Sequence, residues 1–231
     1  MPTPTDYLKN VALRVIEPVI GFLARHNVSP NTITTVGTLL TVAAGVVYGT
    51  GHIMTAGWLM AVTAFFDVLD GSVARRTGRS TRFGAFYDSS LDRVADGALM
   101  AGLTVFYATN PIHHNIWMAV VCLVGMVGTF LISYTRARAE SIGIDSKVGV
   151  MQRPERIVLL SAPQALFGLF WNGWVLIGIV ILLAVTAWIT AVQRILFVYH
   201  ATQGLDSQPI KMVSDPAPKA VSAPAPRRAQ S

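Results

Sequence analysis

Charge and cysteine are both scarce in this chain, and each scarcity excludes a class of protein. Charged residues make up only 13% of the 231 residues, about half the share that is usual in a soluble domain. The single cysteine, Cys122, lies in an apolar stretch, which excludes a disulfide framework and predicts a plain packing role. With 52% hydrophobic residues, the composition is typical of one compact helical domain that crosses a membrane several times.

The few basic residues are not spread evenly along the chain. All 18 Lys and Arg residues lie in four zones, 9–25, 75–93, 136–156 and 194–228. The apolar stretches between the zones contain none. Zones rich in Lys and Arg are typical of the cytoplasmic side of the plasma membrane, so we expect all four zones to lie there. The net charge of +6 is therefore expected to face anionic lipid headgroups rather than nucleic acid, and both termini are expected to be cytoplasmic.

Apolar stretches of bilayer-spanning length predict an all-α integral membrane protein with six transmembrane helices. A more charged stretch, residues 5–25, is expected to form an amphipathic helix in the membrane interface. The membrane domain would cover residues 1–204, and residues 205–231, rich in Pro, Ala and Ser, are expected to be a disordered tail. The expected transmembrane helices are residues 32–49, 54–76, 84–108, 115–139, 154–170 and 174–199.

Four aspartates stand out where the second and third expected helices meet. Asp67 and Asp70 end one helix, and Asp88 and Asp92 begin the next, at spacings that put each pair on one helix face. Carboxylates at membrane depth are costly and mark a functional site by default. Because a short loop makes the two helices antiparallel neighbours, the four side chains are expected to converge. They would hold Mg²⁺ or Mn²⁺, with room for two ions.

Small and basic residues surround the aspartates. Gly71, Ala74 and Gly84 leave room for a ligand to approach the backbone, and Arg75, Arg79 and Arg82 would face its phosphates. These features predict a site for a phosphoanhydride held by metal at the membrane surface. Two alternatives remain open: surface carboxylates that pair with nearby arginines, and the cation or proton path of an ion-coupled transporter.

The pattern resembles the signature of the CDP-alcohol phosphotransferases, Asp-x₂-Asp-Gly-x₂-Ala-Arg-x₈₋₉-Gly-x₃-Asp-x₃-Asp. Every fixed position is present between Asp67 and Asp92, and the resemblance covers roughly residues 5–200. It implies a homodimeric transferase that uses CDP-diacylglycerol and two metal ions, with Asp92 as general base. The implied metal ligands are Asp67, Asp70, Asp88 and Asp92. The implied CDP-lipid contacts are Asn31, Thr32, Ile33, Thr34, Gly71, Ala74, Arg75, Thr81 and Gly84.

A second cationic cluster is expected at the same depth as the aspartates. Clustered arginine suits a phosphate-bearing acceptor, because the guanidinium fork matches phosphate geometry. Ordinary flanking of membrane helices by basic residues is the alternative. The cluster comprises Arg136 and Arg138, Arg153 and Arg156, and Arg194.

The local sequence around these arginines resembles the phosphatidylinositol-phosphate synthases of the family, whose members carry Lys where Arg136 stands. The resemblance implies a phosphorylated polyol as acceptor, namely 1D-myo-inositol 3-phosphate (inositol 1-phosphate). Glycerol 3-phosphate, the acceptor of a phosphatidylglycerophosphate synthase, is the next candidate, followed by free inositol or serine. The implied acceptor-phosphate contacts are Ser133, Arg136, Pro154, Arg156 and Arg194.

Two further features concern helix packing. Asp96 lies one turn beyond the aspartate motif on the same helix face, and we expect it to support the ligands or pair helices rather than bind metal. Small residues at four-residue spacing, Gly37 with Thr41 and Gly125 with Thr129, permit close helix packing and give weak support to the implied homodimer.

Overall fold

The computed structural model describes residues 17–146, 148–151 and 153–203. Within these ranges the chain forms long α-helices and no strand, and residues 17–25 are also helical. The long helices are α2 (Pro30–Gly49), α3 (Ile53–Thr77), α4 (Arg82–Thr109), α5 (Ile116–Ser141), α6 (Arg153–Phe167) and α7 (Trp174–Thr202), with a 3₁₀ turn η1 (Phe170–Gly173) before α7.

These six helices correspond to the six expected ones, but only four are apolar and long enough to cross a membrane: α2, α3, α5, and α7 with η1. Helix α6 has 15 residues, which is about 22 Å of helix against a hydrocarbon core of about 30 Å. Helix α4 has 28 residues, but its first half carries the charged side chains of the aspartate motif. The chain is a helical membrane protein, and crossing by α4 and α6 stays a prediction.

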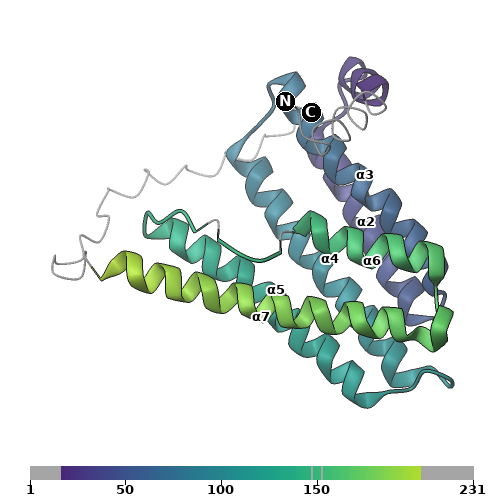
Figure 1. Cartoon of the computed structure of the whole chain (residues 1–231). Coiled ribbons are helices and arrows are strands. Elements are labelled where there is room, and N and C mark those ends of the chain that lie inside the picture. The colour runs from purple at the N-terminus through teal and green to yellow at the C-terminus, as the bar shows by residue number, and fades with distance from the viewer. Residues whose placement is uncertain (1–16, 147, 152, 204–231) are drawn as a thin grey trace, which may run out of the picture.

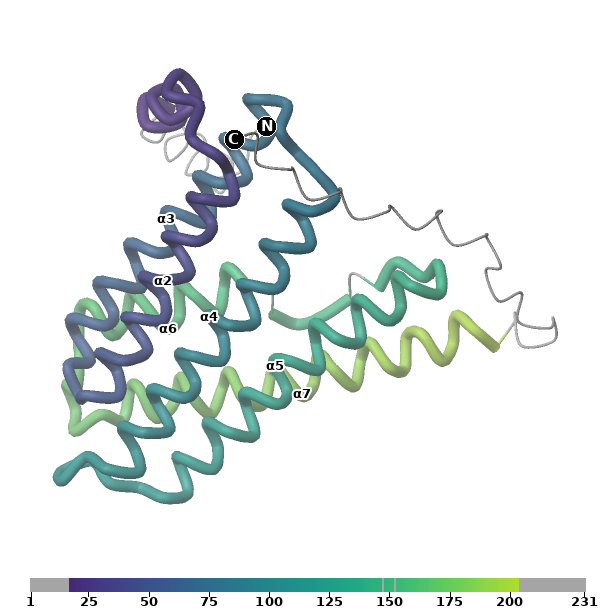
Figure 2. The backbone as a smooth tube through the Cα atoms, turned by 180° about the vertical axis from the view of Figure 1, so that it is seen from behind, coloured from purple at the N-terminus to yellow at the C-terminus, as the bar shows by residue number. Residues whose placement is uncertain are grey.

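The helices pack in an order that differs from their order in sequence. Helix α2 packs against both α3 and α4, α3 against α6, α4 against α5, and α5 against α7. The helices lie close together at one end of the molecule and splay apart towards the end that carries the α3–α4 turn (Figure 1). The view from behind shows the same divergence between the α2–α3 pair and the α5–α7 pair (Figure 2).

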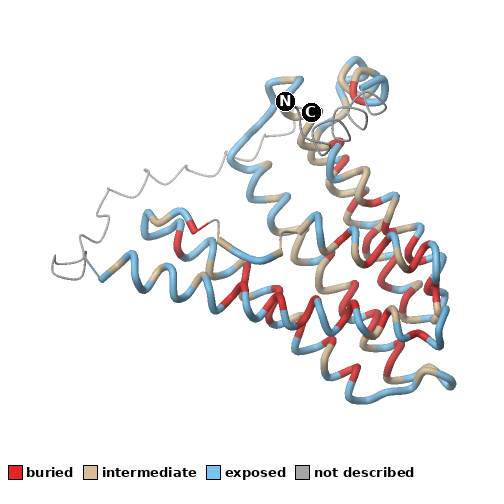
Figure 3. Tube along the Cα trace, in the orientation of Figure 1, coloured by how far each residue is buried: buried red, intermediate tan, exposed pale blue. Residues whose placement is uncertain are grey.

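Buried side chains concentrate where the helices converge (Figure 3). Tyr48, Met60, Phe106 and Leu176 all belong to one apolar cluster that joins α2, α3, α4 and α7. The Tyr48 hydroxyl donates a hydrogen bond to the Leu160 carbonyl, which ties α2 to α6. Cys122 is fully buried in the same cluster, so its predicted packing role is confirmed.

Glycines allow the helix backbones to touch at two crossings. A Cβ on Gly57 would clash with the Ala165 backbone nitrogen of α6, and a Cβ on Gly102 would clash with the Gly45 carbonyl of α2. Because any side chain there would force the backbones apart, these positions fix how α3 meets α6 and how α2 meets α4.

The small residues that were expected to support a dimer pack within one chain instead. Gly37, Thr41, Gly125 and Thr129 are all buried, and a Cβ on Gly125 would lie 3.1 Å from the Ala184 side chain of α7. Their close packing is used inside the helix bundle, so they give no support to a homodimer.

The N-terminal segment is described only in part. Residues 17–25 are helical, and Ile20 packs with Ile33, Leu69 and Val73 near the ends of α2 and α3. The rest of the expected interfacial helix lies outside the described residues, as does the predicted tail over residues 205–231.

Candidate active site

The α3–α4 turn places the aspartates at the splayed end of the bundle. Helix α3 ends at Gly78, whose left-handed φ of 65° suits glycine. Helix α4 is capped by Thr81, whose side chain accepts a hydrogen bond from the Gly84 amide at 2.9 Å. The two helices make few contacts with each other in the described chain, and α2 packs against both. The expectation that α3 and α4 are direct packing neighbours is therefore wrong, because α2 lies between them.

A cleft opens between α3 and α4, beside the start of α2. Its volume is about 200 Å³. Seven of the nine expected CDP-lipid residues line it, together with Asp70, Asp88 and Arg79. Those seven residues are Asn31, Thr34, Gly71, Ala74, Arg75, Thr81 and Gly84.

Two of the expected residues do not reach this cleft with their side chains. Ile33 is 4% exposed and belongs to the apolar cluster with Ile20 and Leu69, while Thr32 is exposed on another face of α2. The helical period explains the split, because Asn31 and Thr34 are three residues apart and share a face that the residues between them do not. The cleft also includes Pro30, Ser80 and Ala85, which sequence reasoning missed although each adjoins an expected residue or the α3–α4 turn.

Local contacts shape the walls of the cleft. The Thr34 hydroxyl donates a hydrogen bond to Asp70 Oδ2 at 2.9 Å, which fixes that carboxylate against α2. A Cβ on Gly84 would lie 3.1 Å from Thr81 Oγ1 and 3.4 Å from Asn31 Oδ1. Glycine at this position therefore keeps open the space where α4 meets α2.

Asp67 and Asp92 are bridged by a cation from a third helix. Arg153, at the start of α6, places Nη1 2.6 Å from Asp67 Oδ2 and Nη2 2.9 Å from Asp92 Oδ1. In the part of the chain that is described, no three His, Cys, Asp or Glu side chains are grouped closely enough to hold a metal ion. The carboxylates of Asp67 on α3 and Asp92 on α4 nevertheless both contact the same guanidinium group, that of Arg153.

The donor set at this centre fits a divalent metal ion. Carboxylate oxygens are the hard ligands that Mg²⁺ and Mn²⁺ prefer, and Arg153 marks a point where a positive charge is already bound by two of them. Asp70 and Asp88 line the adjoining cleft together. All four expected ligands thus lie at the same end of α3 and α4.

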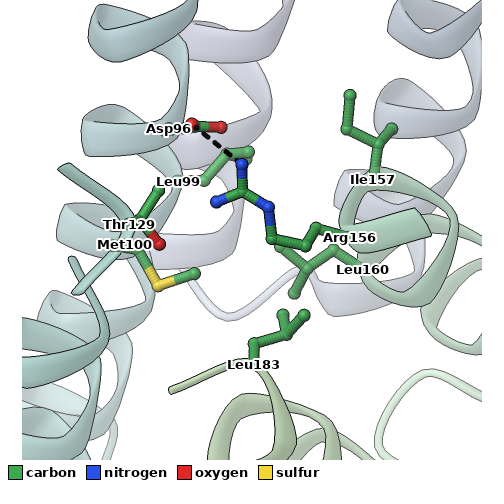
Figure 4. A pocket seen from close by; sticks show the side chains of 8 residues that line it. All are labelled: Asp96, Leu99, Met100, Thr129, Arg156, Ile157, Leu160 and Leu183. Carbon is green, nitrogen blue, oxygen red and sulfur yellow. Dashed lines mark ion pairs between the residues drawn. The ribbon is translucent and has the colours of Figure 1, made fainter. Parts of the chain in front are cut away.

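Asp96 connects this centre to two more arginines. Its carboxylate lies 3.9 Å from Arg93, 3.8 Å from Arg153 and 3.7 Å from Arg156, and its side chain is only 11% exposed. Figure 4 shows the Arg156 guanidinium pointing at Asp96 across a small cavity of about 20 Å³, which Thr129 also lines. These ion pairs agree with the expected role of Asp96 in pairing helices.

Three of the expected acceptor residues lie on three different helices, Arg136 on α5, Arg156 on α6 and Arg194 on α7. Arg194 donates hydrogen bonds to the Val148 carbonyl at 2.9 Å and to the Ile132 carbonyl at 2.6 Å. Arg136 and Arg156 lie close enough to interact electrostatically with Arg194. Clustered guanidinium groups repel one another, so this arrangement favours a bound anion.

The other two expected acceptor residues, Ser133 and Pro154, make no described contact with these arginines. The Ser133 hydroxyl donates to the Thr129 carbonyl of its own helix at 3.5 Å. Pro154 is exposed in the first turn of α6. Arg136 also forms an ion pair with Glu140, one turn along α5, at 2.9 Å, which holds its side chain near the helix end.

Sequence reasoning missed the contact of Arg153 with the aspartates. The sequence placed Arg153 at the same membrane depth as the acceptor arginines, so it was grouped with them. For ion pairs with the aspartates, only arginines closer in sequence were considered. The three-residue spacing of Arg153 and Arg156 puts both on one face of α6 but does not indicate which side chains that face meets.

Comparison with known proteins identifies the class. Residues 27–199 match the CDP-alcohol phosphatidyltransferase family. The archaetidylinositol phosphate synthase of Methanothermobacter thermautotrophicus is 36% identical over 195 residues, which are 84% of this chain and 94% of that protein. The phosphatidylinositol phosphate synthase of Mycobacteroides abscessus is 36% identical over 197 residues, 85% of this chain and 89% of that protein.

Solved structures agree with this result. The phosphatidylinositol phosphate synthase of Mycobacterium tuberculosis with CDP-DAG bound superimposes with a TM-score of 0.73 at 32% identity, covering 80% of this chain and 94% of that one. The same enzyme with manganese and citrate gives a TM-score of 0.72, covering 79% and 88%. The chain therefore belongs to the CDP-alcohol phosphatidyltransferase family. It is a membrane-bound transferase, and the transporter alternative is wrong.

Proposed function

We propose that this enzyme transfers the phosphatidyl group of CDP-diacylglycerol to 1D-myo-inositol 3-phosphate (inositol 1-phosphate), giving phosphatidylinositol phosphate and CMP. The observation that carries the choice of acceptor is that Arg136 and Arg156, from two other helices, lie within electrostatic range of Arg194. A phosphorylated polyol supplies the anion that this cluster favours, whereas free inositol or serine does not. The names of the relatives support the same choice.

The cleft between α3 and α4 is the proposed donor site. Gly71 and Gly84 allow the nucleotide to approach the backbone, and Arg75 and Arg79 from the same wall would contact its phosphates. The proposed metal site holds two Mg²⁺ or Mn²⁺ ions, with Asp67, Asp70, Asp88 and Asp92 as ligands. Bound metal would neutralise the diphosphate and stabilise the phosphate of the departing CMP.

Asp92 is the proposed general base. It would accept the proton of the acceptor hydroxyl, and the hydroxyl oxygen would then form a bond to the β-phosphorus of CDP-diacylglycerol as the bond to CMP breaks. Asp92 is suited to this role because its carboxylate contacts Arg153 of α6, the helix that also carries Arg156 of the proposed acceptor site. The donor on one side and the acceptor on the other can therefore meet at its carboxylate.

We propose that the site faces the cytoplasm of a plasma-membrane protein with both termini on the same side, which the placement of the basic residues supports. A homodimer in a membrane containing anionic lipids is the proposed assembly, on the family resemblance alone. Cross-linking of the purified protein in lipid nanodiscs would test the dimer.

CMP release by the purified enzyme tests the proposed function. The assay supplies CDP-diacylglycerol and Mg²⁺ and compares inositol 1-phosphate, glycerol 3-phosphate and free inositol. We expect release with inositol 1-phosphate and loss of release with EDTA. Release with glycerol 3-phosphate alone would support the proposed role of the aspartates but contradict inositol 1-phosphate as the acceptor. Release only with free inositol would contradict the proposed phosphate-binding role of the arginines.

A further inference from the structure

Arg153 has contacts that neither the donor site nor the acceptor site explains. Its guanidinium reaches Asp67 of α3 at 2.6 Å and Asp92 of α4 at 2.9 Å, and its side chain is 21% exposed. Asp92 is 19% exposed, so its ion pair with Arg153 is better shielded from water than an ordinary surface ion pair, whereas Asp67 is 34% exposed. Arg153 joins three helices at the point where the reaction is proposed to occur.

Arg153 and a metal ion would draw on the same two carboxylates. Asp67 and Asp92 each direct one oxygen at the guanidinium, and a metal ion bound between α3 and α4 would need oxygens of the same two side chains. A divalent ion at this point would lie within repulsive distance of the guanidinium. Binding of a metal ion is therefore expected to weaken the contacts of Arg153, and those contacts to weaken metal binding.

We propose that Arg153 is a positioning residue that competes with the catalytic metal for Asp67 and Asp92. Without metal, its guanidinium joins the carboxylates of α3 and α4 in place of the ion. When metal binds, the guanidinium leaves the two aspartates and is retained by Asp96. This inference rests on the proposed function, because it assumes that these aspartates bind the metal of the transfer reaction.

Asp96 is well placed to retain the displaced side chain. It already lies 3.8 Å from Arg153, and its Oδ2 has no hydrogen-bond partner among the described residues, like Nε of Arg153. The cavity beside Asp96, about 20 Å³ in volume, has room for about one water-sized group. Arg156 shares the same carboxylate (Figure 4), so the exchange connects metal binding to an arginine of the proposed acceptor cluster.

Metal titration without either substrate tests the competition. Binding of Mn²⁺ to purified protein in detergent is followed by the electron paramagnetic resonance signal of free Mn²⁺. We expect Arg153→Gln to lower the Mn²⁺ dissociation constant about tenfold, because the ion no longer has to break two charge-assisted contacts. Arg153→Lys keeps the competing charge and should stay within about threefold of the wild type.

Two control variants separate direct competition from a general change in charge. Arg156→Gln removes a charge from the neighbouring contact with Asp96, and Arg138→Gln removes one from an exposed side chain that contacts Ser141. Both should change the Mn²⁺ dissociation constant less than Arg153→Gln does. An equal effect of Arg156→Gln, or an unchanged or larger constant in Arg153→Gln, would overturn the inference.

Thermal unfolding supplies a second readout that a purely structural role would not reproduce. In EDTA, Arg153→Gln should unfold at a lower temperature than the wild type, because Asp67 and Asp92 lose their cation. Saturating Mn²⁺ should remove the difference, and an equal deficit with and without Mn²⁺ would contradict the inference. CMP release with another acceptor would overturn the proposed function and leave this result intact.

Discussion

Each aspartate of the motif has its own surroundings, and these assign different tasks to chemically identical groups. Asp70 accepts a hydrogen bond from the neutral Thr34 hydroxyl at 2.9 Å, which orients its carboxylate without supplying charge. Asp92 faces Arg153 at 2.9 Å and Arg93 at 3.5 Å. A base must have an oxygen free for the incoming proton, and the proposed departure of Arg153 would free the Asp92 oxygen that it contacts.

Asp92→Asn tests the role of the base. The amide keeps the size of the side chain but cannot accept the proton of the acceptor hydroxyl, so we expect CMP release to fall by about a hundredfold or more. The matched control is Ser89→Ala, one turn away on α4, whose hydroxyl bonds only to the Phe86 carbonyl of its own helix in the described contacts. Wild-type turnover by Asp92→Asn would contradict the role.

Gly84→Val tests whether the cleft between α3 and α4 admits the nucleotide. Its Cβ would lie 3.1 Å from Thr81 Oγ1 and 3.4 Å from Asn31 Oδ1, and the two added methyl groups would fill the remaining space. We expect the KM for CDP-diacylglycerol to rise about tenfold or more with little change in the KM for the acceptor. Gly178→Ala is the control, because nothing lies within 4 Å of a Cβ there.

Helix α6 is the element that carries the link between the two halves of the site. It is the shortest of the long helices, with 15 residues, and it is held against α3 where a Cβ on Gly57 would clash with Ala165. The hydrogen bond from Tyr48 to Leu160 adds a tie to α2. Because Arg153 opens this helix, the position of α6 sets the reach of the guanidinium towards Asp67.

Gly57→Ala tests this positioning. The added methyl group would push α6 away from α3, and overpacking of this kind costs about 1–3 kcal/mol. We expect the midpoint of thermal unfolding to fall by several degrees, since about 1 kcal/mol corresponds to about 2–4 °C in a chain of this size. The KM for the acceptor should rise more than that for CDP-diacylglycerol, and an unchanged unfolding midpoint would contradict the close crossing.

Element boundaries could be predicted from the sequence because their signals are local. Gly49–His52, Thr77–Arg82 and the polar residues after Ser141 end or begin helices through turn and capping chemistry. The contact of Arg153 with Asp67 spans 86 residues and depends on how α6 crosses α3, which no local pattern encodes. The side chains of Thr32 and Ile33 were misplaced for a simpler reason: a continuous run of residues was assigned to a helix that presents only one face to the cleft.

Taken as a whole, the molecule places the proposed donor site and the proposed acceptor site on two different sets of helices. The donor cleft is built from α2, α3 and α4, and the acceptor arginines come from α5, α6 and α7. The α2–α3 pair and the α5–α7 pair diverge at this end of the bundle (Figure 2), while α6 packs against α3 and α4 against α5. Ion pairs of Arg153 with Asp67 and Asp92 and of Asp96 with Arg156 add contacts between α6 and the helices of the donor cleft. A lipid-linked donor and a water-soluble acceptor can therefore approach the same aspartates from different sides.

This division predicts that the two substrates respond separately to mutation. Arg194→Ala removes a guanidinium from the acceptor cluster, so we expect the KM for inositol 1-phosphate to rise about tenfold or more, the equivalent of one charged hydrogen bond of about 1.5–3 kcal/mol. The KM for CDP-diacylglycerol should change little, because Arg194 is not part of the donor cleft. Arg138→Ala is the matched control, since that arginine is exposed at the end of the same α5 that carries Arg136. Equal effects of Arg194→Ala on both constants would mean that Arg194 stabilises the bundle as a whole, through its hydrogen bonds to Val148 and Ile132, rather than binding the acceptor.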